Sequence, residues 1–251
     1  MKIIDAHCHL DFEDYSNLDE VIKENKKAGV AAVITNGTRL ASNLKVLKIA
    51  AKYDIVKAAM GLHPTYADKV ENDEYEKILA LIKKSKDKII AIGEIGLDNK
   101  YPEMDKKKQL EYFTGFVQMA EKLGKPVIVH SRMAELETVE VLESSKLKNI
   151  VMHYFAGRQH LVKRVLDNGW MLSIPTNMIR LQQLQDNVML ADISQILTET
   201  DGPFLSPYKD ISRNEPRFII ESLKKIAEIK KMKIDDVSEK IYKNYKRVYE
   251  K

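Results

Sequence analysis

The chain has 251 residues, of which 44% are hydrophobic and 31% are charged, the balance of an ordinary globular protein. Its 41 basic and 37 acidic residues give a net charge of +4, which suits an anionic substrate but is too small for a protein that coats nucleic acid. The single cysteine, Cys8, excludes an internal disulfide and a four-cysteine zinc site. Because the sequence shows neither a secretory leader nor an apolar run that could span a bilayer, we expect a cytoplasmic protein without membrane contact. No feature indicates an obligate protein partner.

Short apolar runs rich in β-branched residues alternate along the chain with longer amphipathic segments. Eight such runs lie at residues 3–4, 30–35, 55–60, 89–92, 127–129, 150–152, 171–174 and 196–198. The clearest helical segments cover residues 18–28, 74–84, 106–123 and 161–168, and the basic tail at 234–251 indicates a last helix. Eight strands that alternate with helices predict a parallel (β/α)8 TIM barrel, because open sheets usually have fewer strands. We expect one domain over residues 1–251, since no stretch has the composition of a linker.

Polar side chains with metal-binding groups gather where the predicted strands end. Five of the six histidines lie there, namely His7, His9, His63, His130 and His153. Carboxylates take the corresponding places after the fourth and eighth strands, at Glu94, Asp98, Glu199 and Asp201. In a (β/α)8 barrel the C-terminal ends of the strands carry the active site. Histidine and carboxylate ligands without thiolates suit zinc, manganese or magnesium in a catalytic site, and there are enough of them for two ions.

Seven short motifs occur in order over nearly the whole chain. They are DAHCHLD at 5–11, GLHP at 61–64, GEIGLD at 93–98, VHSR at 129–132, HYFAG at 153–157, ETDGP at 199–203 and RNEP at 213–216. Together they resemble the TatD-type deoxyribonucleases, which are metal-dependent hydrolases of the amidohydrolase-like superfamily. The resemblance implies the TIM-barrel fold and cleavage of phosphodiester bonds in single-stranded DNA by a metal-activated water, often from the 3′ end. Thr65 replaces a second histidine of the family pattern, and Tyr154 and Ala156 replace a cysteine and a serine, changes that bear on substrate fit but remove no metal ligand.

The resemblance also implies a role for each residue of the site. His7, His9, Glu94 and Asp201 would bind the first of two divalent cations, which would be Mg²⁺, Mn²⁺ or Zn²⁺. The second ion would be bound by His130, His153 and Glu94, with Glu94 as the bridge between the two ions. Asp201 would also orient the attacking water and take its proton as general base. The substrate phosphate would be contacted by His63 and Arg132.

Other interpretations stay open beside this one. The same metal centre would serve a D-aminoacyl-tRNA deacylase, a lactonase or a small phosphoesterase, because the motifs report the metal site more than the substrate. A binding protein without activity is a further alternative, although the complete ligand set argues against it. Among single residues, His63 could instead bond its own loop, Arg132 could pair with a carboxylate and Asp201 could cap a turn. We expect Asp98 to contact nothing.

Overall fold

The computed structural model describes residues 1–250, in which strands alternate with helices. The strands run in sequence order in one eight-stranded sheet: β1 (Ile3–Cys8), β2 (Val30–Asn36), β3 (Val56–Met60), β4 (Ile89–Gly96), β5 (Val127–His130), β6 (Ile150–His153), β7 (Met171–Pro175) and β8 (Ile196–Glu199). The helices are α1 (Leu18–Lys27), α2 (Leu40–Lys52), α3 (Asn72–Lys84), α4 (Lys106–Leu123), α5 (Glu135–Glu143), α6 (Gln159–Asp167), α7 (Gln182–Leu190), α8 (Ile219–Lys230) and α9 (Ile234–Tyr249). Each apolar run of the sequence forms a strand, which confirms the predicted (β/α)8 fold. The tail helix ends at Tyr249, and Lys251 lies outside the described residues.

Helix α4 shows how the sequence sets the ends of a helix. Asp105 caps the N-terminus, because its side chain accepts a hydrogen bond of 3.0 Å from the backbone N–H of Lys108. At the C-terminus Gly124 has a φ of +63°, a left-handed conformation that lets its N–H donate to the carbonyl of Ala120. The helix therefore has the bounds that the sequence predicts. None of the described helices has the length and apolar character needed to cross a membrane.

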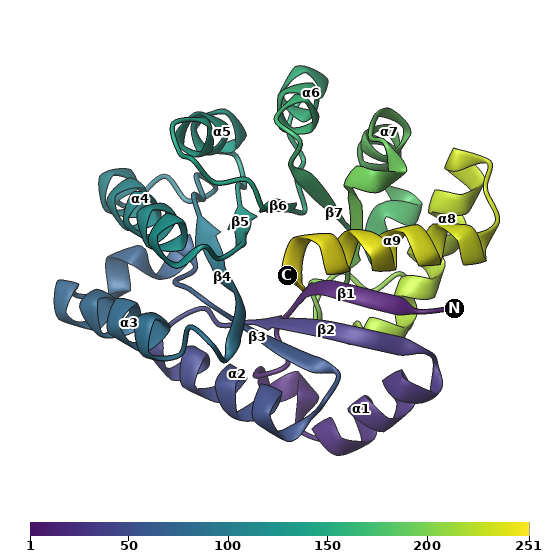
Figure 1. Cartoon of the computed structure of the whole chain (residues 1–251), viewed down its shortest axis with the longest axis horizontal. Coiled ribbons are helices and arrows are strands. Elements are labelled where there is room, and N and C mark those ends of the chain that lie inside the picture. Colours follow the sequence, from purple (N-terminus) through teal and green to yellow (C-terminus); the bar gives the residue numbers. More distant parts are fainter. Residues whose placement is uncertain (251) are drawn as a thin grey trace. The chain divides into compact units, whose positions relative to one another are not determined.

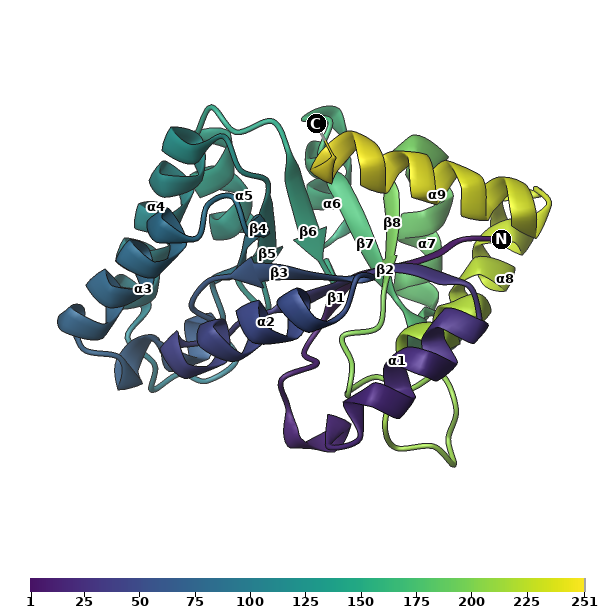
Figure 2. The same ribbon diagram turned by 60° about the horizontal axis from the view of Figure 1, so that its bottom comes forward.

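The described chain forms two compact units, and the single-domain expectation stays a prediction. The first unit comprises residues 1–35, residues 49–57 and the chain from 172 onward. Within it β1 is flanked on both edges, because Asp5 pairs with Val33 of β2 and the Thr198 hydroxyl of β8 donates to the carbonyl of Ile4 at 2.7 Å. A first strand that contacts both the second and the last strand is what closure of a barrel requires. Figure 1 and Figure 2 both show helix α9, in yellow, alongside β1.

The second unit comprises residues 36–48 and 58–171, with β4, β5 and β6 as its complete strands. Gly96 of β4 pairs with His130 of β5. The φ of Gly96 is +143°, and a Cβ atom there would lie 1.9 Å from the carbonyl oxygen of His130. Only glycine therefore allows the two strands to approach this closely, at the point where the predicted metal ligands stand.

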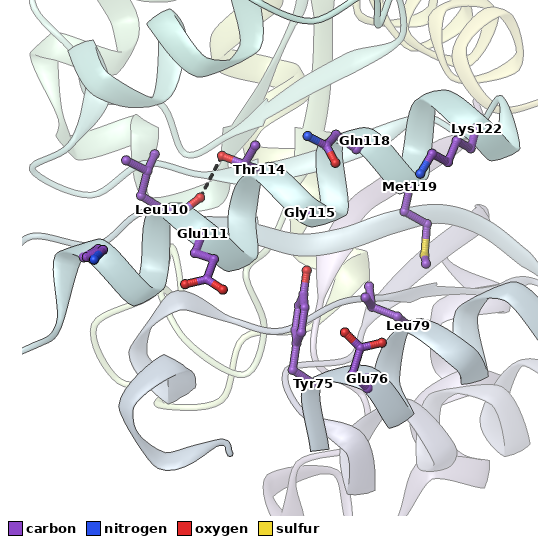
Figure 3. A pocket seen from close by; sticks show the side chains of 11 residues that line it. Tyr75, Glu76, Leu79, Leu110, Glu111, Thr114, Gly115, Gln118, Met119 and Lys122 are labelled. Carbon is purple, nitrogen blue, oxygen red and sulfur yellow. Dashed lines mark hydrogen bonds between the residues drawn. The ribbon is translucent and has the colours of Figure 1, made fainter. Parts of the chain in front are cut away.

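A groove of about 660 Å³ lies between α3 and α4 in the second unit (Figure 3). The ring of Tyr75 lines the groove and stacks on Tyr112 with 4.1 Å between the ring centroids. Gly115 makes room for this ring, since a Cβ there would lie 2.0 Å from the Tyr75 hydroxyl. The groove shares no residue with the predicted metal ligands.

Candidate metal centre

The first cluster of metal-binding groups lies in the first unit, at the end of β1 and just after β8. The Nε2 atoms of His7 and His9 are 3.2 Å apart, and each is 3.5 Å from Oδ1 of Asp201. Both histidine rings are buried, whereas 18% of the Asp201 side chain is exposed. Two imidazoles and a carboxylate this close together form a donor set that fits a divalent cation. The structure thus brings together three of the residues predicted to bind the first ion.

Two strands carry a bulge at a predicted metal ligand. In the stretch around His7, strand β1 has one residue more than its partner β2. Strand β4 likewise has one residue more than β5 in the stretch around Glu94. A bulge of this kind bends the strand and turns a side chain away from regular alternation. In both strands the bulge lies at a predicted metal ligand, His7 in β1 and Glu94 in β4.

The loop that carries Asp201 is bonded to the end of β1. The N–H of Asp201 donates to the carbonyl of His7 at 2.9 Å, and the hydroxyl of Thr200 bonds to the buried carboxyl of Asp5 at 2.6 Å. Burial raises the pKa of Asp5 to about 8, although the hydrogen bonds from Thr200 favour the charged form. Asp5 also accepts the N–H of His7 at 3.2 Å. Its side chain therefore fixes the backbone next to the predicted ligands His7 and Asp201.

The second cluster lies in the second unit around the buried carboxylate of Glu94. The Oε1 atom of Glu94 is 2.8 Å from Nδ1 of His130, 3.4 Å from Nε2 of His63 and 3.8 Å from Nε2 of His153. His63 also bonds its own loop, because its Nδ1 is 2.7 Å from the hydroxyl oxygen of Thr65. The sequence predicts His63 as a phosphate contact or a loop residue, and the structure adds the geometry of a metal ligand. The roles assigned to these histidines stay predictions.

The expectation that Asp98 contacts nothing is wrong. Asp98 is fully buried, and its Oδ2 accepts hydrogen bonds from Nε2 of His130 at 3.0 Å and from Nε of Arg132 at 2.9 Å. The Nη2 atom of Arg132 approaches the same oxygen to 2.7 Å. Burial opposes the ionisation of Asp98, but these bonds outweigh it and hold the pKa of the carboxyl well below its usual range. The sequence signal for this role was its position four residues after Glu94 in the GEIGLD motif.

His130 is held between two carboxylates, Glu94 at Nδ1 and Asp98 at Nε2. Burial opposes its protonation, yet the hydrogen bonds with Asp98 and Glu94 raise the pKa of the imidazole above its ordinary value. A histidine that binds a metal through one nitrogen usually donates the other N–H to a carboxylate, which fixes the ring. The second cluster therefore also fits a divalent cation, with Asp98 as the group that orients one ligand.

A sequence model of the TatD related DNases matches residues 4–250 of the chain. The chain belongs to this family. An uncharacterized metal-dependent hydrolase of Methanocaldococcus jannaschii is 36% identical to it over 245 residues, which cover 97% of this chain and 95% of that protein. The human deoxyribonuclease TATDN3 is 31% identical over 262 residues, with 99% of this chain and 95% of that protein covered.

Solved structures agree with this membership of the TatD family. The crystal structure of YjjV, a TatD homologue of Escherichia coli, superposes with a TM-score of 0.92 at 25% sequence identity. The match covers 98% of this chain and 97% of YjjV, so the whole fold is that of a (β/α)8 TatD protein. Together with the relatives above, this match identifies the chain as a metal-dependent hydrolase that acts on ester bonds.

Proposed function

We propose that this TatD-family hydrolase cleaves phosphodiester bonds of single-stranded DNA from the 3′ end, with one divalent cation at each cluster. The observation that carries the proposal is the presence of two groups of histidines and carboxylates, His7, His9 and Asp201 in one unit and His63, Glu94 and His130 in the other. Two cations suit phosphodiester hydrolysis, because together they stabilise the attacking and the leaving oxygen. The name of the human relative, a deoxyribonuclease, supports DNA as the substrate.

The exposure of the side chains supports a division of labour at the first cluster. His7 and His9 are buried and suited to hold a cation, which when bound would be Mg²⁺, Mn²⁺ or Zn²⁺ and would lower the pKa of a water. Asp201 alone among the three is partly exposed, at 18% of its side chain, and its backbone is anchored to His7. A fixed carboxylate that a water molecule can reach suits the general base that takes the proton.

At the second cluster Glu94, His130 and His153 would hold the other cation. Arg132 is the candidate for the substrate phosphate. Asp98 binds the Nε and Nη2 atoms of its guanidinium, while 40% of the side chain stays exposed. An arginine oriented in this way presents its remaining N–H groups in a fixed direction, as recognition of a phosphate requires. The bridge between the ions by Glu94 and a phosphate contact by His63 stay predictions.

The test is digestion of 3′- and 5′-labelled single-stranded DNA by chelated protein, with Mg²⁺, Mn²⁺ or Zn²⁺ added back. Asp201→Ala is compared with Asp210→Ala, which removes an exposed carboxylate from the following loop. We expect metal-restored cleavage by the wild type and by Asp210→Ala, and a loss of at least about 100-fold in Asp201→Ala, in the range of a lost general base. Intact DNA with every metal, beside turnover of D-aminoacyl-tRNA, a lactone or a simple phosphoester, would overturn the proposal in favour of that substrate.

A further inference from the structure

Two phenylalanine rings extend outward from the first cluster, all within the first unit. The ring of Phe12 stacks on the imidazole of His9, with 5.0 Å between the centroids and 21° between the planes. The ring of Phe204 meets Phe12 edge to face at 5.9 Å. Phe204 is 51% exposed, one of the most exposed large hydrophobic side chains of the described residues. An aromatic surface therefore runs from a metal ligand to the solvent.

The backbone under both rings is bonded to the ligand segments. The N–H of Phe12 donates to the carbonyl of His9 at 3.2 Å, and the N–H of Phe204 donates to the carbonyl of Asp201 at 3.0 Å. On the other side of Phe204, the carbonyl of Pro203 accepts the N–H of Asn214 at 2.8 Å, and Asn214 is fully buried. The backbone that carries the two rings is thus held at a fixed place relative to these residues, so little backbone entropy remains to be lost when a flat group stacks on the rings.

Packing inside the protein does not account for the position of Phe204. A phenylalanine that served the core would be buried, as Phe113, Phe116 and Phe155 are in this chain. An exposed ring beside metal ligands instead suits a flat, apolar partner that arrives with the substrate. Stacking of bases on aromatic side chains is the usual way in which proteins bind single strands without reading their sequence. Every base offers such a face, whereas a base within a duplex already stacks on its neighbours.

We propose that Phe204, supported by Phe12, is a stacking platform for an unpaired base next to the scissile phosphodiester. This inference rests on the proposed nuclease function and adds the reason for a preference for single strands. It assigns Phe204 to substrate binding and not to the chemical step. Replacing its ring should therefore raise KM and leave kcat nearly unchanged.

The test compares oligonucleotides that differ in one base. KM and kcat are measured on single strands that carry an ordinary nucleotide or an abasic nucleotide at each position flanking the cleaved bond. The proteins are the wild type, Phe204→Leu, Phe204→Tyr and, as a control, Met189→Ala, which truncates a residue of α7 that is 64% exposed. For the wild type we expect KM to rise by roughly 5- to 100-fold at one abasic position, the range of a base–aromatic stack. Phe204→Leu should show that rise on the intact strand and no further rise on the abasic one. Phe204→Tyr keeps an aromatic face and should therefore keep the difference between intact and abasic strands, while Met189→Ala behaves as the wild type.

A second readout does not depend on turnover. Single strands that contain 2-aminopurine at the same position are titrated into Asp201→Ala protein, and transfer of this base to the ring should change their fluorescence only while Phe204 is present. Equal KM of Phe204→Leu and the wild type on the intact strand, or an equal loss on intact and abasic strands, overturns the platform while leaving the nuclease in place. Absence of any DNA cleavage by the metal-loaded wild type overturns the nuclease itself, and the platform with it. Unfolding temperatures of all variants show whether the fold is retained.

Discussion

The buried carboxylate of Asp98 leads to a prediction for the variant Asp98→Asn. The change keeps the shape of the side chain and removes the charge that binds His130 and Arg132. Hydrogen bonds to charged groups contribute about 1.5–3 kcal/mol each to stability. Because 40% of the Arg132 side chain is exposed, its share is screened, and we expect a total loss of ~2 kcal/mol in the free energy of unfolding. For a chain of this size that corresponds to a fall of roughly 4–8 °C in Tm.

The same substitution should act on metal binding at one cluster only. A carboxylate that orients a ligand histidine typically contributes about 10- to 100-fold to metal affinity. Titration calorimetry of Mn²⁺ or Zn²⁺ into chelated Asp98→Asn protein should therefore show one site weakened by that factor. The other site should be unchanged, because the Asp98 side chain bonds His130 and Arg132 of the second cluster. Activity should fall together with occupancy of the weakened site.

The matched control is Asp73→Asn on the surface of α3. Asp73 forms an exposed pair with Lys77, and 79% of its side chain is accessible. Exposed pairs of this kind contribute less than about 1 kcal/mol, so its Tm and metal titration should match those of the wild type. A wild-type Tm and two wild-type affinities in Asp98→Asn would refute the reasoning, because they would mean that His130 and Arg132 keep their positions without the buried charge.

Three further predictions concern the frame of the site. Gly96→Ala should lower the free energy of unfolding in urea by at least ~2 kcal/mol, because the added Cβ clashes with the backbone of His130. In the control Gly124→Ala the added Cβ meets no atom within 4 Å, so only about 1 kcal/mol of backbone strain is expected. Asn214→Ala removes two buried hydrogen bonds that the side-chain amide donates, to the Thr176 hydroxyl at 2.7 Å and to the Thr200 carbonyl at 2.9 Å. We expect the free energy of unfolding to fall by ~2–3 kcal/mol in a denaturation experiment and kcat to fall as well. A wild-type kcat would argue against a role of Asn214 in holding the Asp201 loop. Chelation should lower Tm reversibly, because a cation at 100 times its Kd stabilises the folded state by about 2.7 kcal/mol, and an unchanged scan would show that the clusters hold no ion.

Much of the fold and of the ligand set follows from sequence patterns alone. The eight apolar runs predict the strands, and the placement of polar residues after them predicts that His7, His9 and Asp201 lie together, as they do. Helix bounds follow where a cap is present, as at Asp105 and Gly124 of α4. These features depend on local periodicity and on a general property of parallel sheets, that the C-terminal ends of the strands meet.

The aromatic surface at the first cluster does not follow from such patterns. Phe12 and Phe204 lie far apart in the sequence, and neither belongs to a periodic segment. Phe12 comes directly after the motif at 5–11 and Phe204 directly after the motif at 199–203, and an apolar residue at such a position gives no signal of metal binding. Their contact arises because the loop of Asp201 is bonded to the end of β1, a tertiary arrangement that the sequence pattern does not specify.

The partnership of Asp98 with Arg132 depends on strand register, which explains why periodicity could not reveal it. Gly96 pairs with His130, and the ladder continues past the strand ends, where the N–H of Asn99 donates to the carbonyl of Arg132 at 2.9 Å. Asp98 therefore lies across from Arg132. Both strands are buried, so neither shows the apolar–polar alternation that would reveal their register, and the extra residue of β4 around Glu94 shifts it once more. The bulge in β4 at Glu94 is therefore part of the register that places Asp98 beside His130 and Arg132.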